Sequence, residues 1–473
     1  MRPLLGKTAR ALAVMGVVLA LPYASPRLRA LRITEAPRAK NAEATGGKEG
    51  LAIGEATLSA SQNEATVTNA LPETTRHAEV DPAVLAKAAG SLAIEDATGH
   101  ALDAFYTRLA ATLRKETPAI TRVLHYGDSL ITSDFISGTM RRKMQARFGD
   151  AGHGFILIAN AWEWYFHNDI AHSASDGWTM TRITGPLNGD GMYGLGGVSF
   201  RADGEASATF ATKSKGDYGT KASRFDVYYL EQPGGGGMGL YAAGNKPETL
   251  STAGPKKAAR VRSVRVPDGV AQLTIRAWGA GARLFGVAME RDVPGVVYDA
   301  LGANGARAKL LEAMNVEHWA EQMKLRDPAL IVLQYGTNET AWGFNEEYEK
   351  VFGGIVERLK IAAPDASILI CAPLDRAERA QGGFKTMGVI PKLVEAQRNV
   401  ARDAKVAFWN TFEAMGGGGS MGKWVKASPQ LASWDLTHPT PEGAELIGEM
   451  LFAAMLAGYQ AYASTHPEAP RLE

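Results

Sequence analysis

Short, mainly apolar runs separated by stretches of helical periodicity dominate the second half of the chain. Runs of this length that do not alternate with polar residues are typical of strands buried on both faces of a parallel sheet. We therefore expect five such strands. The runs lie at residues 123–126, 296–298, 330–335, 368–372 and 406–409.

Most intervals between these runs carry apolar residues at three- and four-residue steps, which predicts helices. A last helix is expected after residue 440, because Thr440 can cap it and Pro441 suits its first position. The alternation of strands and helices predicts an α/β fold with a doubly wound, five-stranded parallel sheet. The expected helices lie within 83–114 and at 135–148, 307–323, 346–361 and 390–404.

One interval does not fit this alternation. The 146 positions from Gly149 to Gly295 far exceed the roughly 30 residues of a strand–helix–strand unit. A structureless loop of that length does not occur in a compact domain. Strand-like segments punctuated by Gly, Pro and Asp occur at 196–210, 225–230, 259–266 and 272–278. We expect an inserted all-β sandwich at residues 151–290, which interrupts a discontinuous domain formed by 83–150 and 291–465.

Aromatic side chains are frequent in the inserted segment. Such side chains either stack on ligand rings or fill a core. One hypothesis is that the module contacts carbohydrate, and the alternative is that most of these aromatics are core residues. The aromatics concerned are Trp162, Trp164, Tyr165, Trp178, Tyr193 and Trp278.

The first residues have the charge order of a secretory signal. Arg2, Lys7 and Arg10 precede an uncharged stretch at 11–21, which is shorter than the ~20 residues of a membrane span. We expect a signal peptide or signal anchor at 1–25 and a disordered tether at 26–82, where apolar periodicity is absent. The chain is thus expected to be exported, periplasmic or associated with the cell envelope, with a membrane tether if the signal is not cleaved.

Charge and cysteine content exclude several classes of partner and site. The formal net charge is +1 and charges of both signs are interspersed, so nothing indicates a nucleic-acid partner. Cys371 is the single cysteine, which excludes an internal disulfide and a cysteine-rich metal site.

Several reactive residue types follow the predicted strands. Ser129 and Asn338 each come three residues after a strand, Gly302 follows the 296–298 run, and Asp435 and His438 precede the last helix. In open parallel sheets, ligands bind beyond the carboxyl ends of the strands. A serine, an imidazole and a carboxylate at this edge are the groups that a serine hydrolase requires.

Other segments of the chain carry the same short patterns. Asp150/His153 and Asp169/His172 share the Asp-x-x-His spacing, but they lie at the entrance of the insertion, where a structural role is expected. Ser420 lies in a Gly-x-Ser-x-Gly motif at 418–422, with no room after it for the strands that such a nucleophile needs. The Gly-x-Gly-x-x-Gly pattern at 189–194 has no strand before it and no helix after it, so a dinucleotide site is not expected.

Four blocks together resemble one family. Gly127-Asp128-Ser129, Gly302, Gly336-Thr337-Asn338 and Asp435-Leu436-Thr437-His438 occur in the order found in the SGNH (GDSL-type) hydrolases. The stretch 125–155 is similar to the bacterial peptidoglycan O-acetylesterases of this family. Those proteins also carry a β domain like a carbohydrate-binding module, inserted after the first block. The resemblance covers about residues 100–460.

The resemblance implies a role for each matching residue. Ser129 would attack an ester carbonyl, His438 would accept its proton, and Asp435 would orient and stabilise His438. The backbone amides of Ser129 and Gly302 and the side-chain amide of Asn338 would hold the oxyanion. No metal or organic cofactor is implied.

Two of these assignments have alternatives, and Asp128 is left out of the chemistry. Gly305 is a second candidate for the Gly302 position. Asn338 is alternatively a turn-forming residue with no substrate contact. Asp128 is expected to brace the turn without taking part in the chemistry.

The implied function is removal of O-acetyl groups from peptidoglycan or another wall or matrix polysaccharide. Two alternatives stay open. The same residues would serve a polysaccharide O-acetyltransferase, because an acyl-enzyme does not specify its acceptor. A non-catalytic wall-binding protein is the other alternative, although it has no reason to retain the serine, glycine, asparagine and histidine together.

Overall fold

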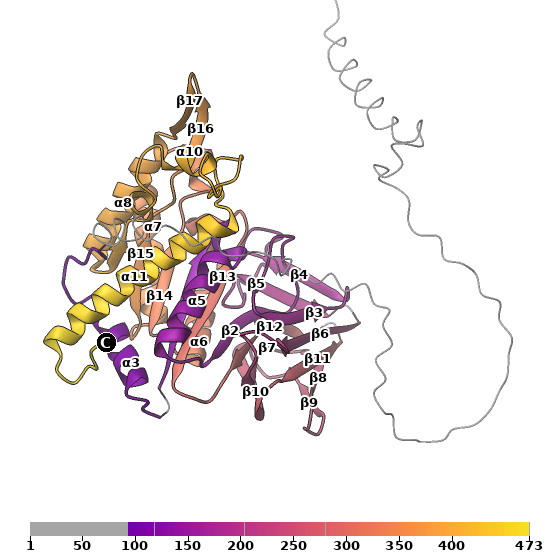
Figure 1. Cartoon of the computed structure of the whole chain (residues 1–473). Helices are drawn as coiled ribbons and strands as arrows, with labels where there is room; N and C mark the ends of the chain where they lie inside the picture. Colours follow the sequence, from indigo (N-terminus) through magenta and orange to yellow (C-terminus); the bar gives the residue numbers. More distant parts are fainter. Residues whose placement is uncertain (1–92, 118, 203, 280, 473) are drawn as a thin grey trace, which may run out of the picture. The chain divides into compact units, whose positions relative to one another are not determined.

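The computed structural model describes residues 93–117, 119–202, 204–279 and 281–472. The expected signal at 1–25, the expected tether at 26–82 and the start of the 83–114 helix lie outside these residues. A five-stranded, fully parallel sheet with the order β13-β1-β14-β15-β18 forms the centre of the described part (Figure 1). Its strands are β1 (Ile120–Gly127), β13 (Gly295–Gly302), β14 (Leu330–Gln334), β15 (Ser367–Cys371) and β18 (Ala407–Trp409). The predicted doubly wound α/β sheet is confirmed.

Both faces of this sheet are covered by helices. Along β14, Ile331 and Leu333 pack in one hydrophobic core while Leu330 and Val332 pack in another, because successive side chains of a strand point to opposite faces. Helices α3 (Asp103–Leu113), α5 (Phe135–Phe148) and α11 (Pro441–Thr465) share the core of the second pair. Helices α6 (Val316–Arg326), α7 (Tyr348–Ala362) and α8 (Val389–Ala404) share the core of the first.

Local signals set the ends of α5 and α11, and one predicted helix is divided into two. Helix α5 ends at Gly149, whose φ of 99° is strained for any other residue. The Thr440 hydroxyl accepts a hydrogen bond from Gly443 N (3.2 Å) and caps α11 as expected. The prediction of one helix over 307–323 is wrong. Asn315 caps α6 by accepting from His318 N (2.9 Å), so the preceding turns are a separate 3-10 helix, η2 (Ala308–Ala313).

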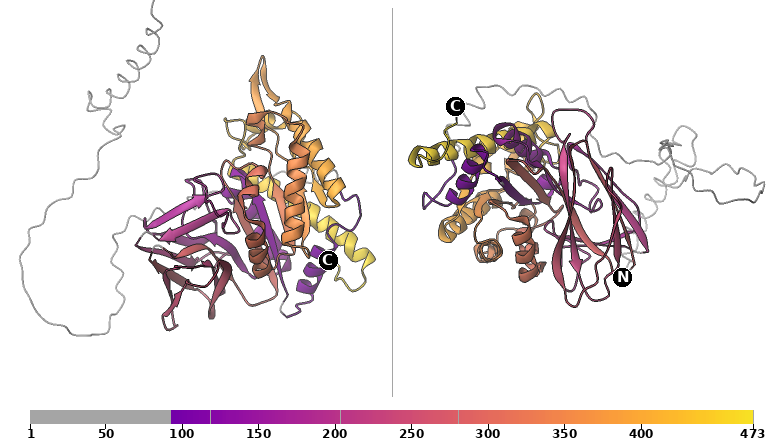
Figure 2. Two further views of the ribbon diagram at one scale, coloured as in Figure 1. Left: turned by 180° about the vertical axis from the view of Figure 1, so that it is seen from behind. Right: turned by 90° about the horizontal axis from the view of Figure 1, so that it is seen from below.

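The inserted segment forms two antiparallel sheets that face each other (Figure 2). An additional β domain is therefore present, and its strands begin at Gly152 and end at Glu290. The stretch 196–210 is not one strand but two. The sheet that contains β12 has β2 (Gly152–Leu157), β4 (Trp178–Arg182), β5 (Val198–Ala202), β7 (Ala222–Glu231), β10 (Ala258–Gly269) and β12 (Arg283–Glu290); its partner has β3 (Ile170–Ala174), β6 (Glu205–Thr212), β8 (Gly237–Ala242), β9 (Glu248–Ser251) and β11 (Gln272–Trp278). We propose 151–290 as the boundaries of this domain.

Most aromatics that were candidates for sugar contact are core residues. Tyr165, Trp178 and Tyr193 are buried, and Trp162 is partly buried beneath the Arg182 guanidinium, 5.9 Å from its ring centre. Trp164 remains 61% exposed. Packing in the sandwich therefore accounts for most of the aromatic content of the insertion.

The inserted sheets and the parallel sheet are joined by a buried ionic network. The Glu290 carboxylate at the end of β12 is fully buried and accepts hydrogen bonds from Arg122, Arg224 and Arg326. Arg326 also donates to both oxygens of Asp299 on β13, at 2.6 and 2.7 Å. Burial opposes ionisation of Glu290, but the three guanidinium groups outweigh it and hold the Glu290 pKa well below its ordinary value.

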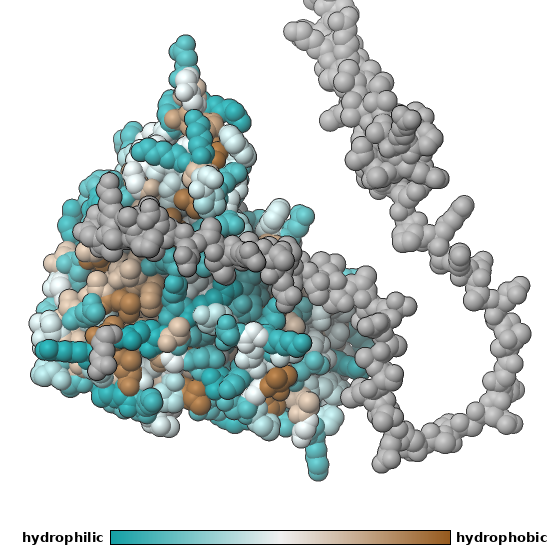
Figure 3. All heavy atoms as spheres, viewed as in Figure 1, coloured by the Kyte–Doolittle hydropathy of each residue, from teal (hydrophilic) through white to brown (hydrophobic). Residues whose placement is uncertain are grey.

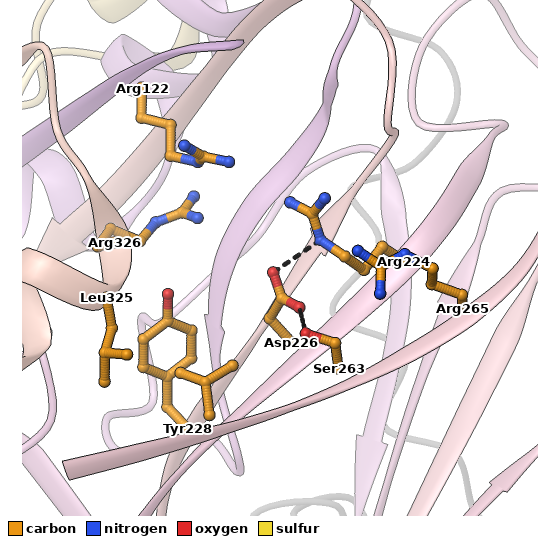
Figure 4. Close-up of a pocket in the computed structure, with 9 residues that line it drawn as sticks. Arg122, Arg224, Asp226, Tyr228, Ser263, Arg265, Leu325 and Arg326 are labelled. Carbon is orange, nitrogen blue, oxygen red and sulfur yellow. Dashed lines mark hydrogen bonds and ion pairs between the residues drawn. The ribbon is translucent and has the colours of Figure 1, made fainter. Parts of the chain in front are cut away.

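A polar cavity of about 310 Å³ lies against this network. Figure 4 shows Arg122 and Arg326 on one side of it, and Arg224 and Asp226 on the other. Arg122 belongs to the amino-terminal half of β1, so the cavity lies away from the carboxyl end of the sheet. The arginines that line it already pair with carboxylates of the protein, and we assign this region a structural role.

The remaining described elements are short and lie between the larger ones. Figure 1 places the β16–β17 hairpin (residues 377–386) at one extremity of the described residues. On the face drawn in Figure 3, apolar side chains occur in small groups among hydrophilic ones. Among the described helices, none has the length and apolar character needed to cross a membrane. The short elements are α4 (Ser129–Thr132), η3 (Glu339–Trp342), the hairpin of β16 (Ala377–Ala380) and β17 (Gly383–Thr386), α9 (Thr411–Ala414) and α10 (Ser420–Val425).

Candidate active site

Ser129 lies on a tight turn at the carboxyl end of β1. A side chain at Gly127 would overlap Ile131 Cγ1 at 2.4 Å, so the turn requires glycine there. The Asp128 carboxylate accepts from Leu130 N (3.1 Å) and caps α4, as its expected bracing role requires. The chain therefore presents Ser129 at the first position of α4, beyond the edge of the sheet.

The structure brings Ser129, His438 and Asp435 together. Ser129 Oγ lies 2.8 Å from His438 Nε2, and His438 Nδ1 lies 2.6 Å from Asp435 Oδ2. Asp435 Oδ1 also accepts from the backbone N–H groups of Thr437 (2.9 Å) and His438 (3.0 Å), which holds the carboxylate beside the ring. These three side chains come from segments 309 residues apart in sequence, so only the fold makes them neighbours.

Electrostatics fix the tautomer of His438. Burial opposes ionisation of Asp435, but hydrogen bonds from the His438 side chain and from backbone N–H groups lower its pKa to about 2. An ionised carboxylate only accepts, so Nδ1 carries the proton of the neutral ring and Nε2 is free to accept from Ser129. The hydrogen bond to Asp435 in turn raises the pKa of His438, against an opposing effect of burial.

Gly302 ends β13 and Asn338 follows β14, and these are the two strands on either side of β1. Gly302 pairs with Gly127 across β13 and β1, and a side chain there would meet Thr132 N at 2.1 Å. Asn338 Nδ2 donates one hydrogen to Ala306 O (2.9 Å), which leaves the second hydrogen of its amide for another acceptor. Gly305, the alternative to Gly302, is a turn glycine with φ of 75° and no atom near its Cβ position.

The competing motifs have structural partners instead. His153 Nε2 contacts Asn168 O at 2.6 Å, and His172 Nε2 contacts Ile158 O at 3.1 Å. Burial lowers the pKa of His172 to about 4. The rival nucleophile Ser420 is buried, and its hydroxyl donates to Asp375 at 3.3 Å. None of the three contacts the hydroxyl of Ser129.

Glu339 is a further residue of this region that the sequence did not single out. Its Oε1 accepts from Ala308 N (3.0 Å), while Oε2 is buried with no hydrogen-bond partner. Burial first, and the nearby Asp128 carboxylate second, raise the pKa of Glu339 to about 7. Burial likewise raises the pKa of Asp128 to about 6. Glu339 thus anchors the same 306–308 segment that Asn338 contacts, and the only sequence signal was its position next to Asn338.

The described residues hold no group of three His, Cys, Asp or Glu side chains placed to bind a metal ion. A hydroxyl hydrogen-bonded to an oriented imidazole is the arrangement that activates a serine nucleophile.

Comparisons with known proteins give a family match over part of the chain. Residues 267–446 match the sequence model of the GDSL-like lipase/acylhydrolase family. The match begins inside the inserted segment and ends in α11, so it includes the Asn338 and His438 blocks but not Ser129. No curated protein sequence matches the chain.

Solved structures extend the comparison to the fold. A peptidoglycan O-acetylesterase structure is 22% identical and superimposes with a TM-score of 0.66, covering 78% of this chain and 99% of that chain. A family two carbohydrate esterase from Clostridium thermocellum, in complex with cellohexaose, is 11% identical with a TM-score of 0.25 and covers 62% of this chain and 100% of that one. The second superposition is too weak to carry an argument. The family match over residues 267–446 indicates an enzyme that hydrolyses esters, and the likeness to the first structure shows a shared fold.

Proposed function

We propose that this chain is an exported bacterial carbohydrate O-acetylesterase, which removes acetyl groups from peptidoglycan or another wall or matrix polysaccharide through an acyl-enzyme on Ser129. One observation carries the catalytic part of the proposal. Ser129 Oγ is 2.8 Å from an imidazole nitrogen whose other nitrogen is held by a carboxylate at 2.6 Å.

In the first half of the reaction, His438 Nε2 takes the Ser129 proton as Oγ attacks the acetyl carbonyl. The negative charge that develops on the carbonyl oxygen is held by the backbone amides of Ser129 and Gly302 and by the second amide hydrogen of Asn338. One such donor contributes roughly 2.7–4 kcal/mol at the transition state. Protonated His438 then gives its proton to the departing sugar oxygen, and the acetyl group remains on Ser129.

In the second half, water replaces the sugar hydroxyl. His438 takes a proton from the water as its oxygen attacks the acetyl-serine carbonyl, and acetate leaves when His438 returns that proton to Ser129 Oγ. The side chains of His438 and Asp435 are 42% and 48% exposed. Water therefore has access to this pair for the hydrolytic step.

The choice of polysaccharide rests on sequence and fold together. The first block is similar to those of peptidoglycan O-acetylesterases, the described residues share the fold of one such enzyme, and the first 25 residues have the pattern of an export signal. A polymer outside the cytoplasm is the substrate that fits all three.

The proposal is tested by measuring free acetate after incubation with O-acetylated peptidoglycan and, separately, with O-acetylated xylan. A third reaction supplies p-nitrophenyl acetate and a sugar acceptor. We expect acetate release from at least one polysaccharide. Acetylation of the acceptor without free acetate would identify a transferase, and binding to the polysaccharide without either product would identify a wall-binding protein.

The pH dependence of hydrolysis should report His438. Only the neutral ring accepts the serine proton, and Asp435 raises the ring pKa, so kcat/KM should fall as the pH drops through a value above the ordinary ~6.5. In Asp435→Asn this acid limb should move to lower pH, and the rate should fall by roughly 10²–10⁴-fold.

A matched control is available at the start of α3 for the pH experiment. His100 Nδ1 and Asp103 Oδ2 form an equivalent imidazole–carboxylate contact at 2.8 Å, in which Asp103 is the first residue of α3 and His100 precedes that helix. Asp103→Asn should leave the acid limb unchanged. An unchanged limb in Asp435→Asn would mean that His438 is not the group being titrated.

A further inference from the structure

Three tryptophans of this chain are much more exposed than the other six. Of its nine tryptophans, Trp342 is 74% exposed, Trp164 61% and Trp434 59%, and the next, Trp278, is only 37% exposed. A large indole ring in water gives up the stabilisation that burial of its area would provide. Exposed aromatic groups gathered in one region often mark a ligand-binding surface.

Two of the three tryptophans lie beside site residues in the same loops. Trp434 directly precedes Asp435, and its turn is held by the hydrogen bond from Ser433 N to His438 O (2.8 Å). Trp342 ends η3, the short helix that follows Asn338, in which Ala341 N donates to Asn338 O (3.3 Å).

The third tryptophan comes from the inserted domain. Trp164 is two residues before Phe166, whose N–H donates to Thr132 O (3.1 Å) on the short helix that begins with Ser129. Thr132 Oγ1 in turn donates to Asp128 O (2.9 Å). The insertion thus reaches the turn of Ser129 and brings an exposed indole with it.

Each of these rings has a neighbouring group that supports it. The Arg307 guanidinium lies 4.7 Å from the centre of the Trp342 ring. Phe166 lies 6.3 Å from Trp164, and Phe384 of the β16–β17 hairpin lies 6.3 Å from Trp434. Rings that are held in place and still mostly exposed lose little freedom on binding a flat apolar surface, such as the C–H face of a pyranose.

We propose that Trp164, Trp342 and Trp434 are sugar-stacking subsites around Ser129, and that the substrate is a glycan chain bound across the site by rings from three separate loops. This inference rests on the proposed carbohydrate esterase function. It concerns the part of the substrate that Ser129, His438 and Asp435 do not recognise. The sugar-contacting role expected for the inserted domain then belongs to its Trp164 loop.

The test compares Trp164→Ala, Trp342→Ala and Trp434→Ala on p-nitrophenyl acetate and on O-acetylated xylo-oligosaccharides of increasing length. We expect kcat/KM to fall by roughly tenfold more on long oligosaccharides than on the small ester, mainly through KM. Tyr241→Ala is the matched control, because Tyr241 is 37% exposed beneath Arg276 (5.2 Å) on the inserted sheets and should show no such difference. Equal losses on the small ester and on every chain length would indicate a purely structural role and overturn the proposal.

Binding without turnover separates this inference from the esterase proposal. Sedimentation with insoluble peptidoglycan and with insoluble xylan is measured for Ser129→Ala and for the same protein carrying each tryptophan replacement. Weaker sedimentation of the double variants would support the subsites even if no polysaccharide releases acetate. Unchanged sedimentation together with unchanged length dependence would reject them, whatever the esterase result.

Discussion

Replacing Ser129 by alanine should reduce ester hydrolysis by about 10⁴-fold or more while leaving the fold intact. The serine hydroxyl is the group that His438 Nε2 contacts, at 2.8 Å, and without it the imidazole has no nucleophile to activate. The residual rate would come from binding and from the oxyanion donors alone. The measurements are acetate release, circular dichroism and the thermal midpoint of each protein.

Ser420→Ala is the control for this experiment. Ser420 lies in the competing Gly-x-Ser-x-Gly motif, but it is 1% exposed and bonded to Asp375, so its loss should leave kcat within about twofold of the wild type, as for sites away from the chemistry. A Ser129→Ala protein that releases acetate at the wild-type rate would refute the proposed mechanism. Loss of activity in Ser420→Ala at an unchanged thermal midpoint would point to the other motif.

Replacing Glu290 by glutamine should lower the free energy of unfolding by about 3–5 kcal/mol at pH 7, because it removes the buried negative charge that three guanidinium groups share. Glu290 is fully buried, and the side chains of Arg122 and Arg326 are 14% and 1% exposed. The Glu290 pKa is depressed in the fold, so its stabilisation is present above its ordinary pKa, including at pH 7, and is lost as the pH falls toward the folded value. Urea unfolding gives the free energy.

An exposed ion pair of the inserted domain provides the comparison. Glu248 pairs with Arg262 at 2.6 Å, with side chains 36% and 51% exposed, and such pairs contribute about 0–1 kcal/mol. Glu248→Gln should therefore be nearly neutral. If Glu290→Gln were no more destabilising than Glu248→Gln, the network would not stabilise the junction between the two parts of the chain.

The parallel sheet could be predicted because its strands carry their own signal. Each is a short apolar run that must be buried on both faces, and the helix capped by Thr440 follows from local chemistry alone. The sequence prediction named no strand at β2, β3, β4, β8, β9 or β12. The side chains of β3 and β9 are mostly exposed and carry little apolar pattern. Their pairing depends on distant partners, which a local pattern does not contain.

The rule that ligands bind beyond the carboxyl ends of parallel strands singled out Ser129, Asp435 and His438, and their roles came from the resemblance to the SGNH hydrolases. Glu339 could not be identified in that way, since the burial of its carboxyl depends on how the 306–308 segment packs against η3. Trp342 and Trp434 were missed for the converse reason, whereas Trp164 was one of several candidates for sugar contact. Solvent exposure is a property of the folded surface, and Trp164 and Tyr165 are neighbours in sequence with opposite burial.

One hydrophobic core runs without a break from the inserted sheets to one face of the parallel sheet, joining Phe155 and Tyr228 to Tyr126 and Leu333. The inserted domain is therefore not an independent attachment, although it interrupts the sequence like one. Removing it would expose part of the core on one face of the sheet that carries Ser129, so the two parts should melt together in a single transition. We therefore expect the esterase site and the sandwich to unfold as one cooperative unit, and neither to persist without the other.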